Sequence, residues 1–263
     1  MLHLTKILWR YAFATVLACG FVCMSPVSGQ ESAPVIKPRF SPGEFLDNVG
    51  QQTKARWRQL FRTPPPTPST ERLRVAFTLG GLVADSFLAL QAADAQQFKN
   101  NNQELLSYSK VLGVGEKITP GVLAQSKMGE TGDWAAARKQ VLETEQLIVK
   151  LLNEQKDEDL AILVELGVWA RLLEISTTIV SNNDPEVENK IICIGSMKLL
   201  DDLKAQFEKL SQTVQTDESI ARLGAVLDQL QRHWLAAQDH PSIEVVKFSF
   251  EKLHFLMERL TLQ

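Results

Sequence analysis

Apolar residues recur at alternating intervals of three and four through the second half of the chain. Such runs begin at Trp134, Ile220 and Ile243, and each continues for several turns. This spacing places the apolar side chains in one stripe along a helix, with charged residues on the other side. A strand would require a period of two, which no segment shows convincingly. The pattern therefore predicts an all-α protein.

Helix boundaries are marked in the N-terminal half as well. Ser41-Pro42-Gly43-Glu44 has the form of a capping box with proline at the first helical position. It predicts a helix that continues to about Arg62. The proline-rich run 63–68 ends that helix and is expected to form a semi-rigid spacer.

The segment after the spacer is expected to contain two more helices. A long helix is predicted over residues 69–98, followed by a turn at the three asparagines 100–102. A shorter helix then ends near Gly113, which suits a left-handed C-cap. Residues 114–130 contain three glycines and are expected to be the least regular stretch.

Two further helices complete the predicted architecture. The helix expected over 158–180 is apolar nearly all round its middle, which is typical of the centre of a bundle. Another is expected over 184–210. Short connections make sequential helices antiparallel neighbours, so residues 69–263 are predicted to form an antiparallel bundle of about seven or eight helices. A helical-repeat array is the minor alternative, because the Leu-Gly pairs share no common period.

Residues 1–29 have the pattern of an export signal. Lys6 and Arg10 precede an uncharged run over 11–24, and small residues end at Gly29. Cleavage there would make Gln30 the first residue of a mature chain in the periplasm or extracellular envelope. The run is short for a membrane span, which needs about 20 residues. An uncleaved N-terminal membrane anchor, or a lipid on Cys19, is the alternative.

The distribution of charge along the chain is more informative than its composition. The 263 residues are 44% hydrophobic, enough for one large core or two small ones. The formal net charge of −3 gives no general case for nucleic-acid binding. Residues 30–74 carry +4 and residues 75–263 carry −9, so a basic arm precedes an acidic body. Cys193 would be the one cysteine left after cleavage, and its apolar neighbours predict a buried, unreactive thiol.

The arm, residues 30–68, is the most suggestive feature of the sequence. Residues 41–62 form a basic amphipathic pattern, which can dock on the acidic body, contact an anionic membrane surface or bind a partner protein. The residues expected to make such contacts are Lys54, Arg56, Trp57, Arg58, Phe61 and Arg62.

Small and charged residues inside apolar helices suggest a second kind of site. Paired glycines in a helix indicate that a neighbouring backbone packs closely, or that a ligand approaches. A carboxylate in an apolar helix must be ion-paired with another helix or face a ligand, and Arg171 and Glu174 interrupt the same helix. The residues expected around an inter-helix cavity are Gly80, Gly81, Asp85, Glu165 and Trp169.

Glu251 and His254 supply the weak evidence for a metal site. Their spacing places a carboxylate and an imidazole on one helix face. Helical di-iron proteins use two such pairs with two further glutamates, and this chain has a single pair, with Glu165 as one further carboxylate. The sequence contains none of the common catalytic or cofactor-binding motifs.

These patterns favour an exported, non-enzymatic helical protein that binds a partner or scaffolds an assembly in the cell envelope. The first alternative is a carrier of a small apolar ligand, held between helices. The second is a metal-dependent enzyme, and no cofactor is expected otherwise. Because the arm and the body are predicted to be separate units, the bundle is expected to stay folded when residues 30–68 are deleted.

Overall fold

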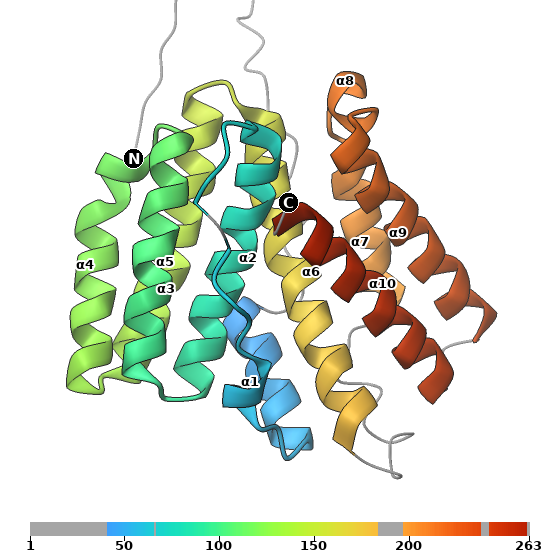
Figure 1. Ribbon diagram of the computed structural model, residues 1–263, viewed down its shortest axis with the longest axis horizontal. Helices are drawn as coiled ribbons and strands as arrows, with labels where there is room; N and C mark the ends of the chain where they lie inside the picture. The colour runs from blue at the N-terminus through green and yellow to red at the C-terminus, as the bar shows by residue number, and fades with distance from the viewer. Residues whose placement is uncertain (1–40, 66, 184–196, 238–241, 262–263) are drawn as a thin grey trace, which may run out of the picture. The chain divides into compact units, whose positions relative to one another are not determined.

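The structure, a computed structural model, describes residues 41–65, 67–183, 197–237 and 242–261. Within these ranges it contains ten α-helices and no strand, so the predicted all-α helical bundle is confirmed (Figure 1). The predicted export signal, Cys193 and the start of the helix expected at residue 184 lie outside the described residues.

Two long helices, α2 (Arg72–Gln91) and α6 (Glu158–Asn183), form the centre of the bundle. A Cβ atom at Gly80 would lie 2.0 Å from the carbonyl oxygen of Val164, and one at Gly167 would lie 2.1 Å from that of Phe77. The two backbones are therefore in direct contact, as the paired glycines predicted. Because Phe77 meets Gly167 while Gly80 meets Val164, the two helices are antiparallel.

Helix α2 is long and apolar enough to span a membrane, with a mean hydropathy of 1.6. However, 83% of that apolar window is buried inside the bundle, as is typical of the core helix of a globular fold.

One flank of the central pair consists of α3 (Ala95–Val111), α4 (Gly115–Thr131) and α5 (Trp134–Glu154). The prediction of a turn at residues 100–102 is wrong, because these asparagines lie inside α3. Asn101 donates from Nδ2 to the Leu82 carbonyl at 2.8 Å, so its amide is satisfied across the helix interface. The chain turns earlier, and Asp94 caps α3 by accepting from the Gln97 N–H.

The prediction that residues 114–130 are irregular is also wrong, since this stretch forms α4. Gly129 allows the close approach of Phe98, whose Cδ1 would lie 2.6 Å from an added Cβ. Gly129, which the sequence pattern suggested would break a helix, therefore lets α3 and α4 pack closely. Gly113 has a φ of +78° and follows α3, as predicted for a C-cap.

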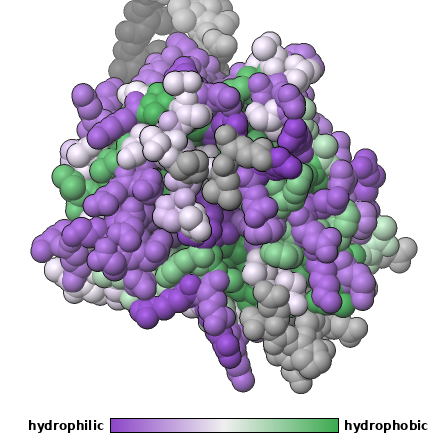
Figure 2. All heavy atoms as spheres, in the orientation of Figure 1, coloured by the Kyte–Doolittle hydropathy of each residue, from purple (hydrophilic) through white to green (hydrophobic). Residues whose placement is uncertain are grey.

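The other flank contains α7 (Met197–Phe207), the short α8 (Gln212–Gln215), α9 (Glu218–Ala236) and α10 (Ile243–Thr261). Helix α10 packs against both α6 and α9. The apolar stripes predicted for these helices face inward, and Leu227 and Leu253 are buried. The face of the molecule shown in Figure 2 is mainly hydrophilic, with apolar side chains in smaller patches.

The arm begins as predicted but soon departs from the predicted helix. The Ser41 hydroxyl accepts from the Glu44 N–H, and the Ser41 N–H donates to Glu44 Oε2 at 2.7 Å, so the capping box is confirmed. The prediction of a helix to Arg62 is wrong, because α1 (Pro42–Gln52) ends ten residues earlier. The next residues, 53–65, form a single 3-10 turn, η1 (Trp57–Leu60), and an otherwise non-helical segment.

We call residues 53–65 the strap. It runs along the outer face of α2 (Figure 1). By contacts, residues 36–263 form one compact unit, and α1 and the strap are part of it. Phe45, Leu46 and Val49 of α1 are buried in the common core. The described part of the arm, residues 41–65, therefore packs as part of the bundle, as expected if the arm docks on the body.

Candidate functional site

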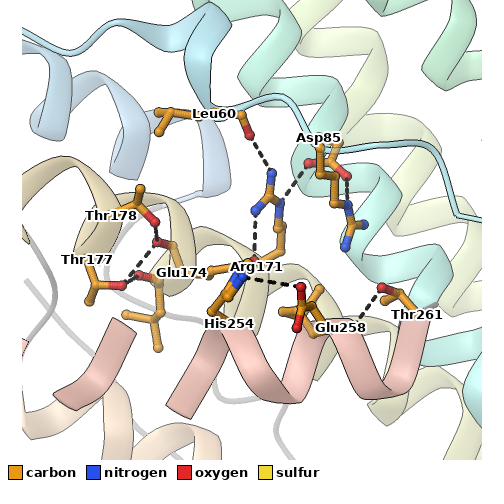
Figure 3. A network of polar contacts seen from close by, with 12 residues as sticks. Leu60, Asp85, Arg171, Glu174, Thr177, Thr178, His254, Glu258 and Thr261 are labelled. Carbon is orange, nitrogen blue, oxygen red and sulfur yellow. Dashed lines mark hydrogen bonds and ion pairs between the residues drawn. The ribbon is translucent and has the colours of Figure 1, made fainter. Parts of the chain in front are cut away.

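A buried ionic network joins the strap to three helices, and Arg171 of α6 is at its centre (Figure 3). The guanidinium donates from Nε to Asp85 Oδ1 at 2.8 Å, from Nη1 to Glu174 Oε2 at 2.7 Å, and from Nη2 to the carbonyl of Leu60 at 2.9 Å. The side chain is 5% exposed. The expectation that charges in this apolar helix pair with another helix is confirmed for Arg171 and Asp85.

Asp85 of α2 bridges two guanidinium groups. Its Oδ1 accepts from Arg171, and its Oδ2 accepts from Nε of Arg62, a strap residue, at 2.8 Å. Burial alone would raise the pKa of Asp85, but the charges of Arg171 and Arg62 lower it below its ordinary value. The aspartate therefore stays ionised and ties the strap to the central helix pair.

Arg62 is bonded much less completely than Arg171. Within the described residues its Nη1 and Nη2 atoms are buried and have no hydrogen-bond partner. The guanidinium lies over Gly81, where an added Cβ would be 2.9 Å from Nη2. Gly81 thus makes room for Arg62, a role distinct from the close helix packing at Gly80.

His254 of α10 completes the network. Its Nδ1 donates to Glu174 Oε1 at 2.8 Å, and its Nε2 lies 3.4 Å from Glu258 Oε1. The hydrogen bond to Glu174 raises the pKa of His254, against the opposing effect of burial. For Glu174, burial acts to raise the pKa, but Arg171 and then the bond from His254 lower it. The imidazole is half-exposed, whereas Arg171, Asp85 and Glu174 are nearly closed to solvent.

The structure gives the metal hypothesis no support. His254 is engaged with Glu174 and Glu258, while Glu251 is exposed on the same helix. Among the residues that the structure describes, no group of three or more His, Cys, Asp or Glu side chains could hold a metal ion.

One cavity lies on each side of the strap. The larger has a volume of about 390 Å³ and lies between the strap, α6 and α10, and it is lined in part by Phe61, Arg62, Ile175 and His254. The smaller, of about 270 Å³, lies between the strap, α2 and α3 and is lined by Arg62, Asp85 and several amide side chains. Arg62 therefore contributes to both cavities.

Of the other strap residues predicted to make contacts, some are exposed to solvent and some pack against the bundle. Lys54, Arg56 and Arg58 are exposed, and Arg58 also makes an ion pair with Asp94 at 3.2 Å. Trp57 and Phe61 are half-buried against the bundle. The strap thus presents three cations to the outside, while Arg62 faces inward.

Gly80, Glu165 and Trp169, which were expected around an inter-helix cavity, line neither of the two cavities beside the strap. Helix α6 occupies the space beside Gly80, and Trp169 is buried with its ring edge-on to Phe45, at 5.7 Å between centroids. Of the residues expected around that cavity, Asp85 lines a cavity, the smaller one beside the strap.

Glu165 faces a second carboxylate, which the sequence pattern did not indicate. Glu145 of α5 is half-buried, and burial and then the charge of Glu165 raise its pKa to about 8. Burial also raises the pKa of Glu165, with Lys209 opposing it. Glu145 stands among polar neighbours in the sequence, so only its position three residues before buried Ile148 could have indicated burial.

The network thus brings together residues that were expected in three separate roles: Arg62 as an outward contact, Asp85 beside a cavity and His254 in a metal site. Charge-assisted hydrogen bonds of this kind fix both the geometry and the register of the segments they join. The arrangement therefore holds the strap, and the cations on its outer side, in a defined position. The chain matched no protein-family model, no curated protein and no solved structure.

Proposed function

We propose that this is an exported, non-enzymatic binding protein of the cell envelope, and that the outer edge of its strap contacts an acidic partner protein. The observation that carries the proposal is a fixed cationic edge. Lys54, Arg56 and Arg58 are exposed, whereas the neighbouring Arg62 is held inward by Asp85. Residues 75–263 carry a formal charge of −9, so the edge is a local region of opposite sign that can orient a partner.

An acidic protein fits this edge better than an anionic membrane does. Each lysine or arginine near an anionic leaflet contributes about 1 kcal/mol, so three give about 3 kcal/mol, weaker than a millimolar affinity. Stronger attachment requires apolar side chains that enter the lipid. Phe45, Leu46 and Val49 would have served that purpose, but they are buried in the bundle.

The export part of the proposal can be tested with the full chain in a Gram-negative host. Mass spectrometry of the periplasmic fraction should give a mature protein that begins at Gln30. Recovery from the membrane with residues 1–29 attached would favour the anchor instead. Recovery of the intact chain from the cytoplasm would exclude export.

The partner contact can be tested with two triple variants of equal charge change. Lys54, Arg56 and Arg58 are replaced by glutamine in one, and the exposed Lys127, Lys139 and Lys150 in the other. The first should lose salt-sensitive binding to immobilised polyglutamate, while the second should keep most of it. Equal losses would mean that binding follows net charge alone and would refute a specific edge. Preferential binding to anionic vesicles would favour the membrane alternative.

A further inference from the structure

We infer that the 390 Å³ cavity between the strap, α6 and α10 is a binding site for a small monocarboxylate with an apolar tail, and that Arg62 binds the carboxylate. This site is distinct from the cationic outer edge of the strap and does not depend on the function proposed above. It places a ligand elsewhere than the sequence analysis expected and gives it an acidic head group.

Arg62 is incompletely hydrogen-bonded within the network. Arg171 uses all three of its nitrogen atoms in hydrogen bonds, whereas Arg62 uses Nε alone. The Arg62 side chain is 19% exposed, and its Nη1 and Nη2 atoms are buried without partners among the described residues. Buried donors are normally satisfied, so this pair lacks an acceptor that a ligand could supply. The two Nη groups of a guanidinium form a planar fork that matches the two oxygens of a carboxylate.

The cavity wall has the composition of a small-molecule site. Leu60, Phe61, Ile175, Phe250 and Met257 supply apolar surface around the charged groups. The volume is within the range of small-molecule sites, which combine apolar walls with a few convergent polar groups. Met257 also lies next to Gly81, beneath the Arg62 guanidinium, so apolar and cationic surfaces adjoin at that point.

The charges around the cavity select among anions. Glu174 and Glu258 also line it, but Glu174 is bound to Arg171 and His254. A doubly charged phosphate would be repelled by these carboxylates, because like charges within a few ångströms disfavour each other. A monocarboxylate places a single negative charge against Arg62 and its tail against the apolar wall. The geometry therefore favours a carboxylic acid over a phosphate ester.

Titration calorimetry of the mature full chain with octanoate tests this inference. We expect saturable binding at one site, and binding at least about tenfold weaker for 1-octanol and octylamine, which lack the charge-assisted bond. Arg62→Lys retains a cation for Asp85 but loses the fork, so it should weaken octanoate binding at least about tenfold. Arg58→Lys is the matched control on the outer side of the strap and should bind as the wild type does.

A second variant protects the test against a folding defect in Arg62→Lys. Thr178 lines the cavity, and Thr178→Leu should narrow it and weaken octanoate binding; it removes the hydroxyl's bond to the Glu174 carbonyl but leaves the bonds among the charged side chains in place. The absence of octanoate binding, equal affinity for 1-octanol, or unchanged binding by Arg62→Lys would overturn the inference, and ordered water would then account for the Arg62 donors. The glutamine variant of Lys54, Arg56 and Arg58 should still bind octanoate, so this site and the proposed function can fail separately.

Discussion

Replacing Glu145 with glutamine should stabilise the protein, and increasingly so as the pH rises. Glu145 lies on α5, where it is half-buried near Glu165 of α6. Within the described residues its Oε2 atom is buried and accepts no hydrogen bond. Burial, reinforced by the charge of Glu165, raises its pKa to about 8. Glutamine has nearly the same shape and cannot ionise, so it removes the cost of placing a second negative charge there.

The size of the effect follows from the difference in pKa between the folded and unfolded states. The ordinary value for the Glu145 carboxyl is 4.5 and the folded value is about 8. Because the folded state binds the proton more tightly, the free energy of unfolding falls as the pH rises between these two values. At 1.36 kcal/mol for each pKa unit, the wild type loses about 3 kcal/mol by pH 7 and about 5 kcal/mol above pH 8. The lost stability is fully regained only below pH 4.5, where the Glu145 carboxyl is protonated in both the folded and the unfolded state.

Urea unfolding followed by circular dichroism, at several pH values from 5 to 8, measures this effect. The stability of the wild type should fall across the range, and the difference between Glu145→Gln and the wild type should grow with pH. Glu143→Gln changes an exposed carboxylate on the same helix and should follow the wild type. His254, whose pKa is also raised, titrates in all three proteins and cancels in the comparison. Parallel curves for Glu145→Gln and the wild type would refute the argument.

Three other substitutions or deletions test the packing and the network, each by urea unfolding. Asp85→Asn leaves two guanidinium groups without their shared carboxylate and should cost about 3–5 kcal/mol. Asp94→Asn keeps the cap of α3 and loses only the ion pair with exposed Arg58, so it should cost less than about 1 kcal/mol. Gly80→Ala forces a Cβ to within 2.0 Å of the Val164 carbonyl and should cost at least about 3 kcal/mol, while Gly121→Ala meets only side-chain atoms and should be tolerated far better. Deleting residues 30–68 should destabilise the bundle, because it uncovers the core side chains against which α1 packs, and an unchanged unfolding midpoint would contradict this account.

The helices that hydrophobic spacing predicted best are those whose boundaries are also marked by side-chain caps. Helix α5 follows Asp133 and α9 follows Asp217, and both aspartates accept from backbone N–H groups of the first turn. The failures occurred where tertiary contacts override local preference. Asn101 is a poor helix residue, but inside α3 its amide bonds to α2, and Gly129 permits close packing in α4. Local sequence cannot reveal a partner that comes from another helix.

The site was partly visible in the sequence as charged residues inside apolar helices. Arg171 and Glu174 were expected to form ion pairs, because an unpaired buried charge is costly. Their partners could not be identified, since Asp85 and His254 lie 86 and 80 residues away from the groups they bind. Arg62 carried a misleading signal, because the continuous helix predicted for the arm would have placed it with the other basic residues on an exposed face.

The same charges explain why the chain adopts a strap instead of the predicted helix. Asp85 and Glu174 are both buried, and without Arg62 the network would hold two carboxylates against the single guanidinium of Arg171. Continuing α1 by ten residues to Arg62 would gain little free energy, because the backbone entropy lost at each added residue nearly cancels its hydrogen bond in a segment that water can solvate. Leaving a buried charge uncompensated costs about 3–5 kcal/mol. Leu60 adds to the difference, since its carbonyl accepts from Arg171 only when the strap is in place. Ending α1 at Gln52 is therefore the consequence of charges placed in α2 and α6, and Arg62→Gln should release the strap before it unfolds the bundle, as faster amide exchange over residues 53–65 would show.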